Sequence, residues 1–379
     1  MSYRNLLRLL LTGLALLPVA APAQPPLPSF NVAAKAWLLI DAASGQPLAA
    51  AHENDRVEPA SLTKLMTAYL SFAAIKEGAL KPEQTVPVSE KAWRSPGSRM
   101  FIEPKRPVTV DELLQGMIVQ SGNDACVALA EAISGSEEAF VQRMNLEAKR
   151  LGLNDTHFVN ATGLPDPQHY STASDLAKLA QAIIRDFPDF YPLYSRKQFT
   201  YNKITQPNRN RLLWLDPTVD GVKTGHTESA GYCLIASGKR GPRRLISVVL
   251  GADSDGLRAQ ESQRLLNHGF QNFDAVRFYD AGQAISKLKV YKGAQSLVEA
   301  GFIDGLILSL PKGMAERMKV QLTSRQPLLA PVQRGQQVGS LTLSLDGETW
   351  GEFPVVALKP VPTAGIVGRA WDSLMLWFQ

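Results

Sequence analysis

The stretch PASLTKLMT, residues 59–67, places a serine and a lysine three positions apart where an apolar segment begins. The apolar residues that follow recur at helical spacing, which predicts a buried helix from near Pro59 to Gly78. Ser61 and Lys64 then share one face of this helix. Because lysine is rarely buried without a partner, the presence of Lys64 on the inner side requires an explanation.

The Ser-Lys pair has a chemical and a structural interpretation. A serine hydroxyl becomes a nucleophile when a base removes its proton, and burial favours the neutral amine that could act as this base. The helix N-terminus also favours a negative charge developing near Ser61. Alternatively, Ser61 caps the helix and Lys64 extends its ammonium to solvent. The pair by itself favours the structural interpretation, because serine and lysine are common residues.

Two other short motifs lie farther along the chain. Ser121-Gly122-Asn123 separates two predicted helices, residues 111–120 and 124–134, and places a hydroxyl and an amide on a short loop. Lys223-Thr224-Gly225 lies on a predicted strand, where the glycine allows a ligand to approach the main chain. Lys223 would supply a fixed positive charge and Thr224 a hydroxyl donor. The three motifs together are far more specific than any one of them.

The order of predicted elements indicates an α+β domain over residues 24–280. Two strands surround the turn at Ser44-Gly45, a largely helical segment covers residues 60–190, and two strands in residues 231–253 precede a closing helix. The early and late strands are expected to join in one sheet, with the helices inserted between them.

Residues 285–360 have a different pattern. Apolar and polar residues alternate with a period of two, and Asp346-Gly347 is typical of a hairpin turn, which predicts a small all-β sandwich domain. Residues 363–379 have a continuous apolar stripe with two tryptophans, which favours an amphipathic helix lying in a membrane surface. The alternative is a terminal helix docked on its own domain.

The first residues indicate export. Arg4 and Arg8 precede an apolar run that is too short to span a membrane comfortably, and Ala21-Pro22-Ala23 resembles a cleavage site. Residues 1–23 are therefore expected to be a signal peptide, with an uncleaved anchor as the alternative. The two cysteines, Cys126 and Cys233, lie in apolar stretches and are expected to be buried thiols rather than a disulfide.

Composition argues against several other classes of partner. The net charge of +5 is spread along the chain without a lysine- and arginine-rich block, so no nucleic-acid partner is expected. The histidines lack the spacing of metal ligands, and no metal or cofactor is expected. Four of them are interpreted as surface or packing residues: His52, His157, His169 and His268.

The three motifs in this order resemble those of low-molecular-mass penicillin-binding proteins of the D-alanyl-D-alanine carboxypeptidase type, the penicillin-binding protein 5/6 group of peptidase family S11. The stretches EPASLTKLMT, SGNDA, THFVNATGL, DGVKTGHT and AGYCLIASG carry the resemblance. It implies a DD-peptidase/β-lactamase-like domain, an antiparallel sheet flanked by helices with a helical subdomain, followed by the β domain and the terminal helix.

The resemblance also implies roles for individual residues. Ser61 would attack the carbonyl between two D-alanines and form an acyl-enzyme, with Lys64 as general base. Ser121 would pass a proton to the leaving D-alanine, and Asn123 would bind the peptide backbone.

The third motif and two arginines would hold the substrate. Lys223, Thr224 and Gly225 would organise the site and bind the terminal carboxylate. The backbone N–H groups of Ser61 and His226 would form the oxyanion hole. Two further residues match arginines that in relatives lie at the carboxylate or near the site: Arg258 and, less closely, Arg209. A role for Thr162, which lies where some relatives have a histidine, is doubtful.

The implied function is removal of the terminal D-alanine from peptidoglycan pentapeptide stems, with penicillin and other β-lactams as covalent inhibitors. The protein would act on the periplasmic side of the inner membrane, attached to its surface by the terminal helix. The alternatives are a class A-like β-lactamase, a D,D-endopeptidase, and a non-catalytic structural protein of the envelope. The first is disfavoured because class A enzymes have Ser-Asp-Asn and a deacylating glutamate, whereas this chain has Ser-Gly-Asn.

Overall fold

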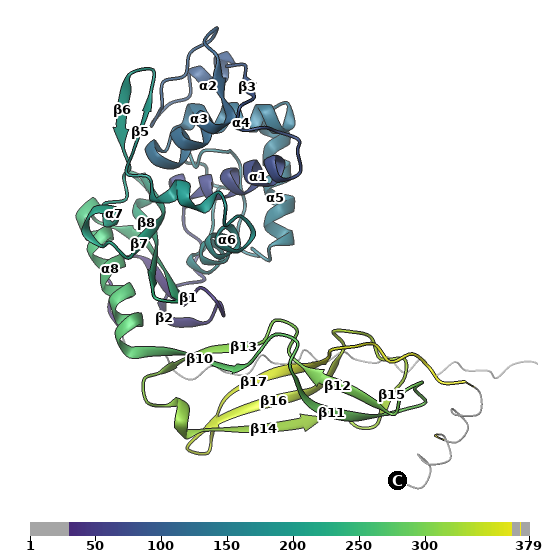
Figure 1. Ribbon diagram of the computed structural model, residues 1–379. Coiled ribbons are helices and arrows are strands. Elements are labelled where there is room, and N and C mark those ends of the chain that lie inside the picture. Colours follow the sequence, from purple (N-terminus) through teal and green to yellow (C-terminus); the bar gives the residue numbers. More distant parts are fainter. Residues whose placement is uncertain (1–29, 366–371, 373–379) are drawn as a thin grey trace, which may run out of the picture. The chain divides into compact units, whose positions relative to one another are not determined.

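Strands from the two ends of the first domain meet in one antiparallel sheet. A computed structural model of the chain describes residues 30–365 and residue 372. The sheet has the order β2-β1-β9-β8-β7 (Figure 1). Its strands are β1 (Ala36–Asp41), β2 (Pro47–Ala51), β7 (Val219–Thr227), β8 (Gly231–Arg240) and β9 (Arg243–Ala252). This confirms the predicted joining of early and late strands.

Strand β1 shows how the sheet is buried on both faces. All six of its residues are buried. Leu38 and Ile40 pack in the core shared with the helical segment, whereas Trp37 and Leu39 pack in a second core with residues of α8 (Asp255–Asn272). Successive side chains of a strand point to opposite faces, so one short apolar run supplies both cores.

The helical segment between β2 and β7 carries two of the three motifs. Its elements are η1 (Ala60–Thr63), α1 (Lys64–Lys76), α2 (Glu90–Trp93), α3 (Val110–Gln115), η2 (Gly116–Gln120), α4 (Asn123–Ser134), α5 (Glu137–Arg150), α6 (Ala173–Asp186), η3 (Tyr191–Ser195) and α7 (Leu212–Leu215). Two short ribbons accompany them, β3 (Thr85–Val86) with β4 (Val108–Thr109) and β5 (Gln198–Tyr201) with β6 (Ile204–Pro207).

The predicted helix of residues 111–120 differs from the structure in its second half. Only α3 is α-helical, and the chain then widens into the π-helical turn η2. The N–H of Gly122 donates to the carbonyl of Gly116 at 3.1 Å, which closes this wider end. Single π turns often occur at functional sites, and here the turn directly precedes the second motif.

The C-terminal part is rich in β-strands, as predicted. A two-stranded sheet pairs β10 (Phe273–Tyr279) with β13 (Leu306–Pro311), and a six-stranded sheet has the order β14-β16-β17-β12-β11-β15. The strands of the larger sheet are β11 (Ala284–Tyr291), β12 (Leu297–Gly301), β14 (Met318–Ser324), β15 (Leu328–Leu329), β16 (Gln337–Leu345) and β17 (Glu348–Ala357). Asp346-Gly347 forms the predicted turn between β16 and β17.

Domain limits remain predictions, although strand structure already begins at Phe273, before the expected start at residue 285. One compact unit comprises the described residues up to 287 and residues 299–317, and another contains residues 288–298 and the described residues from 318 on. The predicted signal peptide (1–23) and nearly all of the predicted terminal helix (363–379) fall outside the described residues. Within residues 30–365, no helix has the length and apolar character needed to cross a membrane.

Candidate active site

The structure brings Ser61 and Lys64 into direct contact. Ser61 lies in the 3-10 turn η1, and Lys64 is the first residue of α1. The Lys64 ammonium nitrogen is 2.8 Å from Ser61 Oγ and 2.5 Å from the carbonyl oxygen of Thr162. Lys64 is only 1% exposed, so it does not extend to solvent. The structural interpretation of the pair as a cap and a solvated lysine is therefore wrong.

Burial changes the acid strength of Lys64. Loss of solvation disfavours the ammonium form, and the positive charge of Arg209 acts in the same direction. Together they lower the pKa of Lys64 from 10.5 to about 8, against the weaker opposing influence of Cys126 and Asp124. With a pKa of about 8, roughly a tenth of Lys64 is neutral at pH 7, and the neutral amine can accept the proton of Ser61.

Two glycines allow neighbouring segments to approach η1, the turn that contains Ser61, closely. A Cβ on Gly163 would lie 1.8 Å from the carbonyl oxygen of Ala60, and a Cβ on Gly225 would lie 3.1 Å from that of Pro59. Gly225 therefore lets strand β7 lie directly against η1, which places the main chain of His226, the next residue, beside the same turn. The His226 ring is exposed and lies 4.0 Å from the Tyr232 ring, measured between centroids.

The second and third motifs meet across the site. Ser121 adopts a left-handed conformation (φ 70°) at the end of η2 and is 3% exposed. The Lys223 ammonium donates to Ser121 Oγ at 2.9 Å and to the carbonyl of Thr224 at 3.1 Å. Thr224 and Gly225 are buried beside it on β7. Sequence positions more than a hundred residues apart thus form one polar cluster.

The charge state of Lys223 differs from the sequence-based expectation. Burial and then the nearby charge of Lys64 lower the pKa of Lys223 well below its usual value. Two ammonium groups in one buried space disfavour each other, so a permanently charged Lys223 is not what these surroundings favour. A bound carboxylate beside Lys223 would restore its charge, because an anion stabilises the ammonium form.

Asn123 is oriented by a loop that sequence reasoning missed. Its side-chain amide donates to the carbonyl of Pro96 at 2.6 Å, and its backbone N–H donates to the carbonyl of Ser98 at 2.7 Å. The buried carboxylate of Asp124 in turn accepts the backbone N–H groups of three successive loop residues: Met100, Phe101 and Ile102. The loop and the second motif therefore hold each other in place.

The two arginines lie in different surroundings. The Arg258 guanidinium is buried and donates to the carbonyl oxygens of Gly225 at 2.9 Å and Cys233 at 3.3 Å, and it also pairs with Asp255. These bonds connect α8, which contains Arg258, to strands β7 and β8. Arg209 is exposed and donates to Ser98 Oγ at 3.1 Å. Its charge lowers the pKa of both site lysines.

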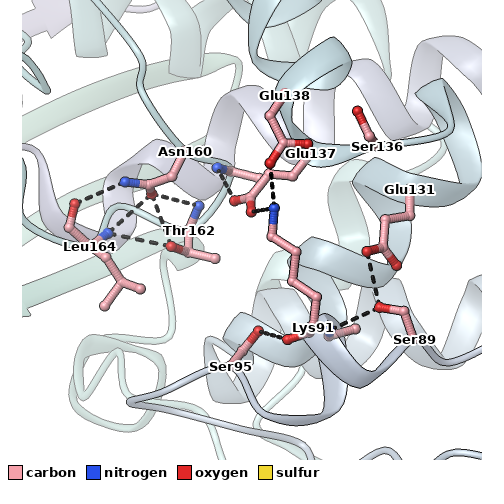
Figure 2. Close-up of polar contacts among 12 residues, drawn as sticks. Ser89, Lys91, Ser95, Glu131, Ser136, Glu137, Glu138, Asn160, Thr162 and Leu164 are labelled. Atoms are coloured by element: carbon pink, nitrogen blue, oxygen red, sulfur yellow. Dashed lines mark hydrogen bonds and ion pairs between the residues drawn. The ribbon is translucent and has the colours of Figure 1, made fainter.

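Two supporting contacts also escaped sequence reasoning. Asn160 Oδ1 accepts the N–H groups of residues 162, 163 and 164, and this shapes the loop whose Thr162 carbonyl binds Lys64 (Figure 2). His169 is buried, and its Nε2 lies 2.8 Å from Thr63 Oγ1. Burial lowers the pKa of His169 to about 4, so it packs as a neutral ring. The Asn-x-Thr-Gly pattern is typical of a turn, but it does not reveal which carbonyl faces the lysine.

The two cysteines and the possible metal-binding side chains were the remaining candidates for a functional role. Cys126 and Cys233 are free and buried, as predicted, and burial raises the pKa of Cys126 to about 12. Such a thiol is a poor nucleophile. Among residues 30–365 and residue 372, no group of three or more His, Cys, Asp or Glu side chains could hold a metal ion.

The loop contacts of Asp124 predict a large effect on stability. Asp124→Ala would leave four backbone N–H groups without their acceptor, three in the loop and that of Ala125, so the free energy of unfolding is expected to fall by about 3 kcal/mol. Asp124→Asn keeps one acceptor oxygen and is expected to lie between the parent and the alanine variant. Urea unfolding measures the series. A loss below about 0.5 kcal/mol in the alanine variant, the range of ordinary surface substitutions, would contradict this account of the loop.

Comparisons with known proteins agree with the geometry. The family described as D-alanyl-D-alanine carboxypeptidase matches residues 19–254, and the domain described as penicillin-binding protein 5, C-terminal domain, matches residues 273–363. D-alanyl-D-alanine carboxypeptidase DacC of Escherichia coli is 42% identical over 390 positions, covering 100% of this chain and 98% of the relative. The corresponding enzyme DacA of Haemophilus influenzae is also 42% identical, covering 91% of this chain and 90% of the relative.

Solved structures give the same result. Penicillin-binding protein 5 of Haemophilus influenzae has a TM-score of 0.84 and 40% identity, and covers 89% of this chain and 100% of its own. Penicillin-binding protein D2 of Listeria monocytogenes, in an ampicillin-bound form, has a TM-score of 0.59 and 31% identity over 64% of this chain and 99% of its own. The resemblance drawn from the motifs is confirmed: this chain belongs to the D-alanyl-D-alanine carboxypeptidase family of serine-type penicillin-binding proteins.

Proposed function

We propose that this enzyme releases the terminal D-alanine from peptidoglycan pentapeptide stems through an acyl-enzyme on Ser61. The observation that carries the proposal is the 2.8 Å contact between Ser61 Oγ and the buried nitrogen of Lys64. A serine hydroxyl needs a neighbouring base to become nucleophilic. Lys64 has the position of this base, and its lowered pKa makes the neutral form accessible.

Acylation begins with proton transfer. Neutral Lys64 takes the hydroxyl proton of Ser61 while Oγ forms a bond to the carbonyl carbon of the penultimate D-alanine. The carbonyl electron pair moves to oxygen, where the backbone N–H groups of Ser61 and His226 stabilise the negative charge. When the carbonyl reforms, the C–N bond breaks and the nitrogen of the terminal D-alanine receives a proton from the Ser121 hydroxyl. Lys64 returns its proton to Ser121, so free D-alanine leaves and the site is neutral again.

Hydrolysis completes the cycle. A water molecule gives a proton to Lys64 and attacks the ester carbon, and the C–O bond to Ser61 then breaks. Oγ recovers the proton from Lys64, and the shortened stem peptide leaves with a new terminal carboxylate. Penicillin enters through the same first step, but its leaving nitrogen stays tethered after the lactam C–N bond breaks. The ampicillin-bound form of the Listeria relative supports this use of the site.

The other site residues bind different parts of the substrate. The terminal carboxylate is bound by Lys223 and Thr224, with Arg209 at the exposed side. Asn123 uses its remaining amide oxygen for the peptide backbone. Arg258 contributes by positioning Gly225, whose carbonyl it already binds. The named relatives are carboxypeptidases, which favours this function over the β-lactamase, endopeptidase and structural alternatives.

The location of the enzyme follows from its two ends. Residues 1–23 direct export, and the mature enzyme works in the periplasm. The apolar stripe of residues 363–379 then lies in the surface of the inner membrane and keeps the enzyme near its polymeric substrate. The cell-wall function of the family supports the periplasmic location, and the composition of the two ends supports the rest.

Substitution of the nucleophile is expected to abolish both covalent reactions. Ser61→Ala lacks the attacking oxygen, so it forms no fluorescent penicillin adduct and releases no free D-alanine from a peptide ending in D-alanyl-D-alanine. The parent enzyme forms the adduct and releases D-alanine. Adduct formation by Ser61→Ala would contradict the proposal, and rapid penicillin turnover by the parent would favour the β-lactamase alternative.

Acylation is expected to depend on pH through Lys64. The ammonium form cannot accept a proton, so the acylation rate constant is half-maximal near the Lys64 pKa of about 8 and levels off above it. Below that pH, the rate falls about tenfold per unit. Arg209→Gln removes a positive charge that lowers this pKa, so its profile shifts to higher pH. Stopped-flow acylation by penicillin between pH 6 and 10 is the test, and an unchanged profile in Arg209→Gln would contradict the assignment.

The terminal segment is expected to bind membranes. Truncation after Pro362 removes the apolar stripe, so the mature enzyme loses cosedimentation with anionic phospholipid vesicles while its penicillin acylation rate stays unchanged. Equal cosedimentation of the truncated and full-length enzymes would show that the anchor lies elsewhere.

A further inference from the structure

The side chain of Glu137 joins three elements beside the site. Glu137 is the first residue of α5, and its side chain is only 12% exposed. One carboxylate oxygen accepts the backbone N–H of Ala161 at 3.0 Å, and the other lies 2.9 Å from the ammonium of Lys91 on α2. Figure 2 shows both contacts, with the Asn160 turn directly beyond them. Neither Glu137 nor Lys91 touches the nucleophile or its base.

The segment that Glu137 holds is the one that holds Lys64. The carbonyl of Thr162 accepts the Lys64 ammonium at 2.5 Å, and the carbonyl of Ala161 accepts Thr67 Oγ1 at 2.7 Å. Lys64 and Thr67 both belong to α1. Residues 161 and 162 therefore connect the N-terminus of α5 to the face of α1 that carries the base. A shift of the Ala161 amide would move the carbonyl that orients Lys64.

One side of this segment is buried and the other borders open volume: Ala161 is fully buried in the core and Thr162 is 2% exposed. A cavity of about 470 Å³ borders it, with Asn160, Thr162 and Leu164 on one side and Lys91 and Glu137 among the other lining residues. The side of the loop that faces this volume has fewer packing neighbours than a residue surrounded by the core on all sides. Polar contacts add to the restraint on that side, and they come from Asn160 on one side of the loop and Glu137 on the other.

The neighbouring Glu138 provides a natural comparison. Lys91 lies 2.7 Å from a Glu138 carboxylate oxygen and therefore bridges both acidic residues. The Glu138 side chain is 74% exposed, and its carboxylate binds Lys91 rather than the 160–164 loop. The two glutamates thus share the same cation and the same helix end, and they differ in the contact with Ala161.

We propose that Glu137 is a positioning residue for the general base, because it holds the Ala161–Thr162 segment whose carbonyl fixes the direction of Lys64. This inference rests on the proposed function of Lys64. Misplacing a reacting group by about 1 Å can cost on the order of 100-fold in rate. Loss of the contact therefore slows proton transfer from Ser61 while the groups that bind the ligand stay in place.

The experiment measures acylation of the full-length enzyme by penicillin, with the acylation rate constant and the dissociation constant of the initial complex determined separately. In Glu137→Ala, the rate constant is expected to fall roughly 10- to 100-fold, with the dissociation constant unchanged. Glu137→Gln keeps an oxygen that can accept the Ala161 N–H, so it is expected to restore the rate to within about threefold of the parent.

Two control variants separate positioning from a general weakening of α5. Glu138→Gln removes the other partner of Lys91 and is expected to leave the rate constant unchanged. Ser136→Ala removes the cap of α5, whose hydroxyl accepts the Ala139 N–H at 3.2 Å, and is expected to lower the thermal midpoint without slowing acylation. Should Glu137→Ala not fold, Glu137→Asp replaces it, since its shorter side chain fails to reach Ala161 and should slow acylation about tenfold.

Each outcome decides between defined alternatives. A parental rate constant in Glu137→Ala, or in Glu137→Asp where that variant carries the test, overturns the positioning role. Equal slowing in Ser136→Ala, or a Glu137→Gln variant as slow as Glu137→Ala, also overturns it and indicates a structural effect of the helix end. Absence of acylation in the parent enzyme counts instead against the proposed function of Ser61 and Lys64, so the two failures are distinguishable.

Discussion

The burial of Lys64 is the constraint on which the site depends. An ammonium group without solvent is costly unless acceptors replace the lost water. This chain supplies two acceptors, Ser61 Oγ and the carbonyl of Thr162. Both belong to short irregular segments, a 3-10 turn and a hydrogen-bonded loop, and therefore need support from elsewhere. The buried surroundings that lower the pKa of Lys64 must therefore also hold Ser61 and Thr162 in position.

The fold brings three segments that are distant in the sequence together beside the outermost strand of its sheet. They contain Ser61, Ser121 and Lys223. Strand β7 is the outermost strand of the sheet, and its face at Gly225 lies against η1, while its Lys223 reaches Ser121. The π-helical turn then ends α3 early enough to direct Ser121 inward. The proposed nucleophile, base and proton relay therefore meet between the outermost strand and an irregular helix end.

Sequence patterns predicted the residues that the structure brings together at the candidate site better than the residues that support them. The Ser-Lys spacing, the loop at Ser121 and the strand bearing Lys223 follow from local periodicity, and the joining of early and late strands follows from their order. The contacts of Thr162, Asp124 and Glu137 do not, because they run between side chains and main-chain groups whose directions depend on tertiary geometry. For the same reason, the charge of Lys223 was expected to be fixed, although its surroundings favour loss of the proton.

The central claim is that Lys64 acts as a base because burial makes its neutral form accessible near neutral pH. The most direct measurement is an NMR titration of the lysine side chains in the ligand-free enzyme, with Lys64 assigned by comparison with Lys64→Arg. The account predicts a midpoint for Lys64 near 8. A midpoint near the ordinary lysine value of 10.5 would contradict it, because Lys64 would then be almost entirely protonated where the enzyme works.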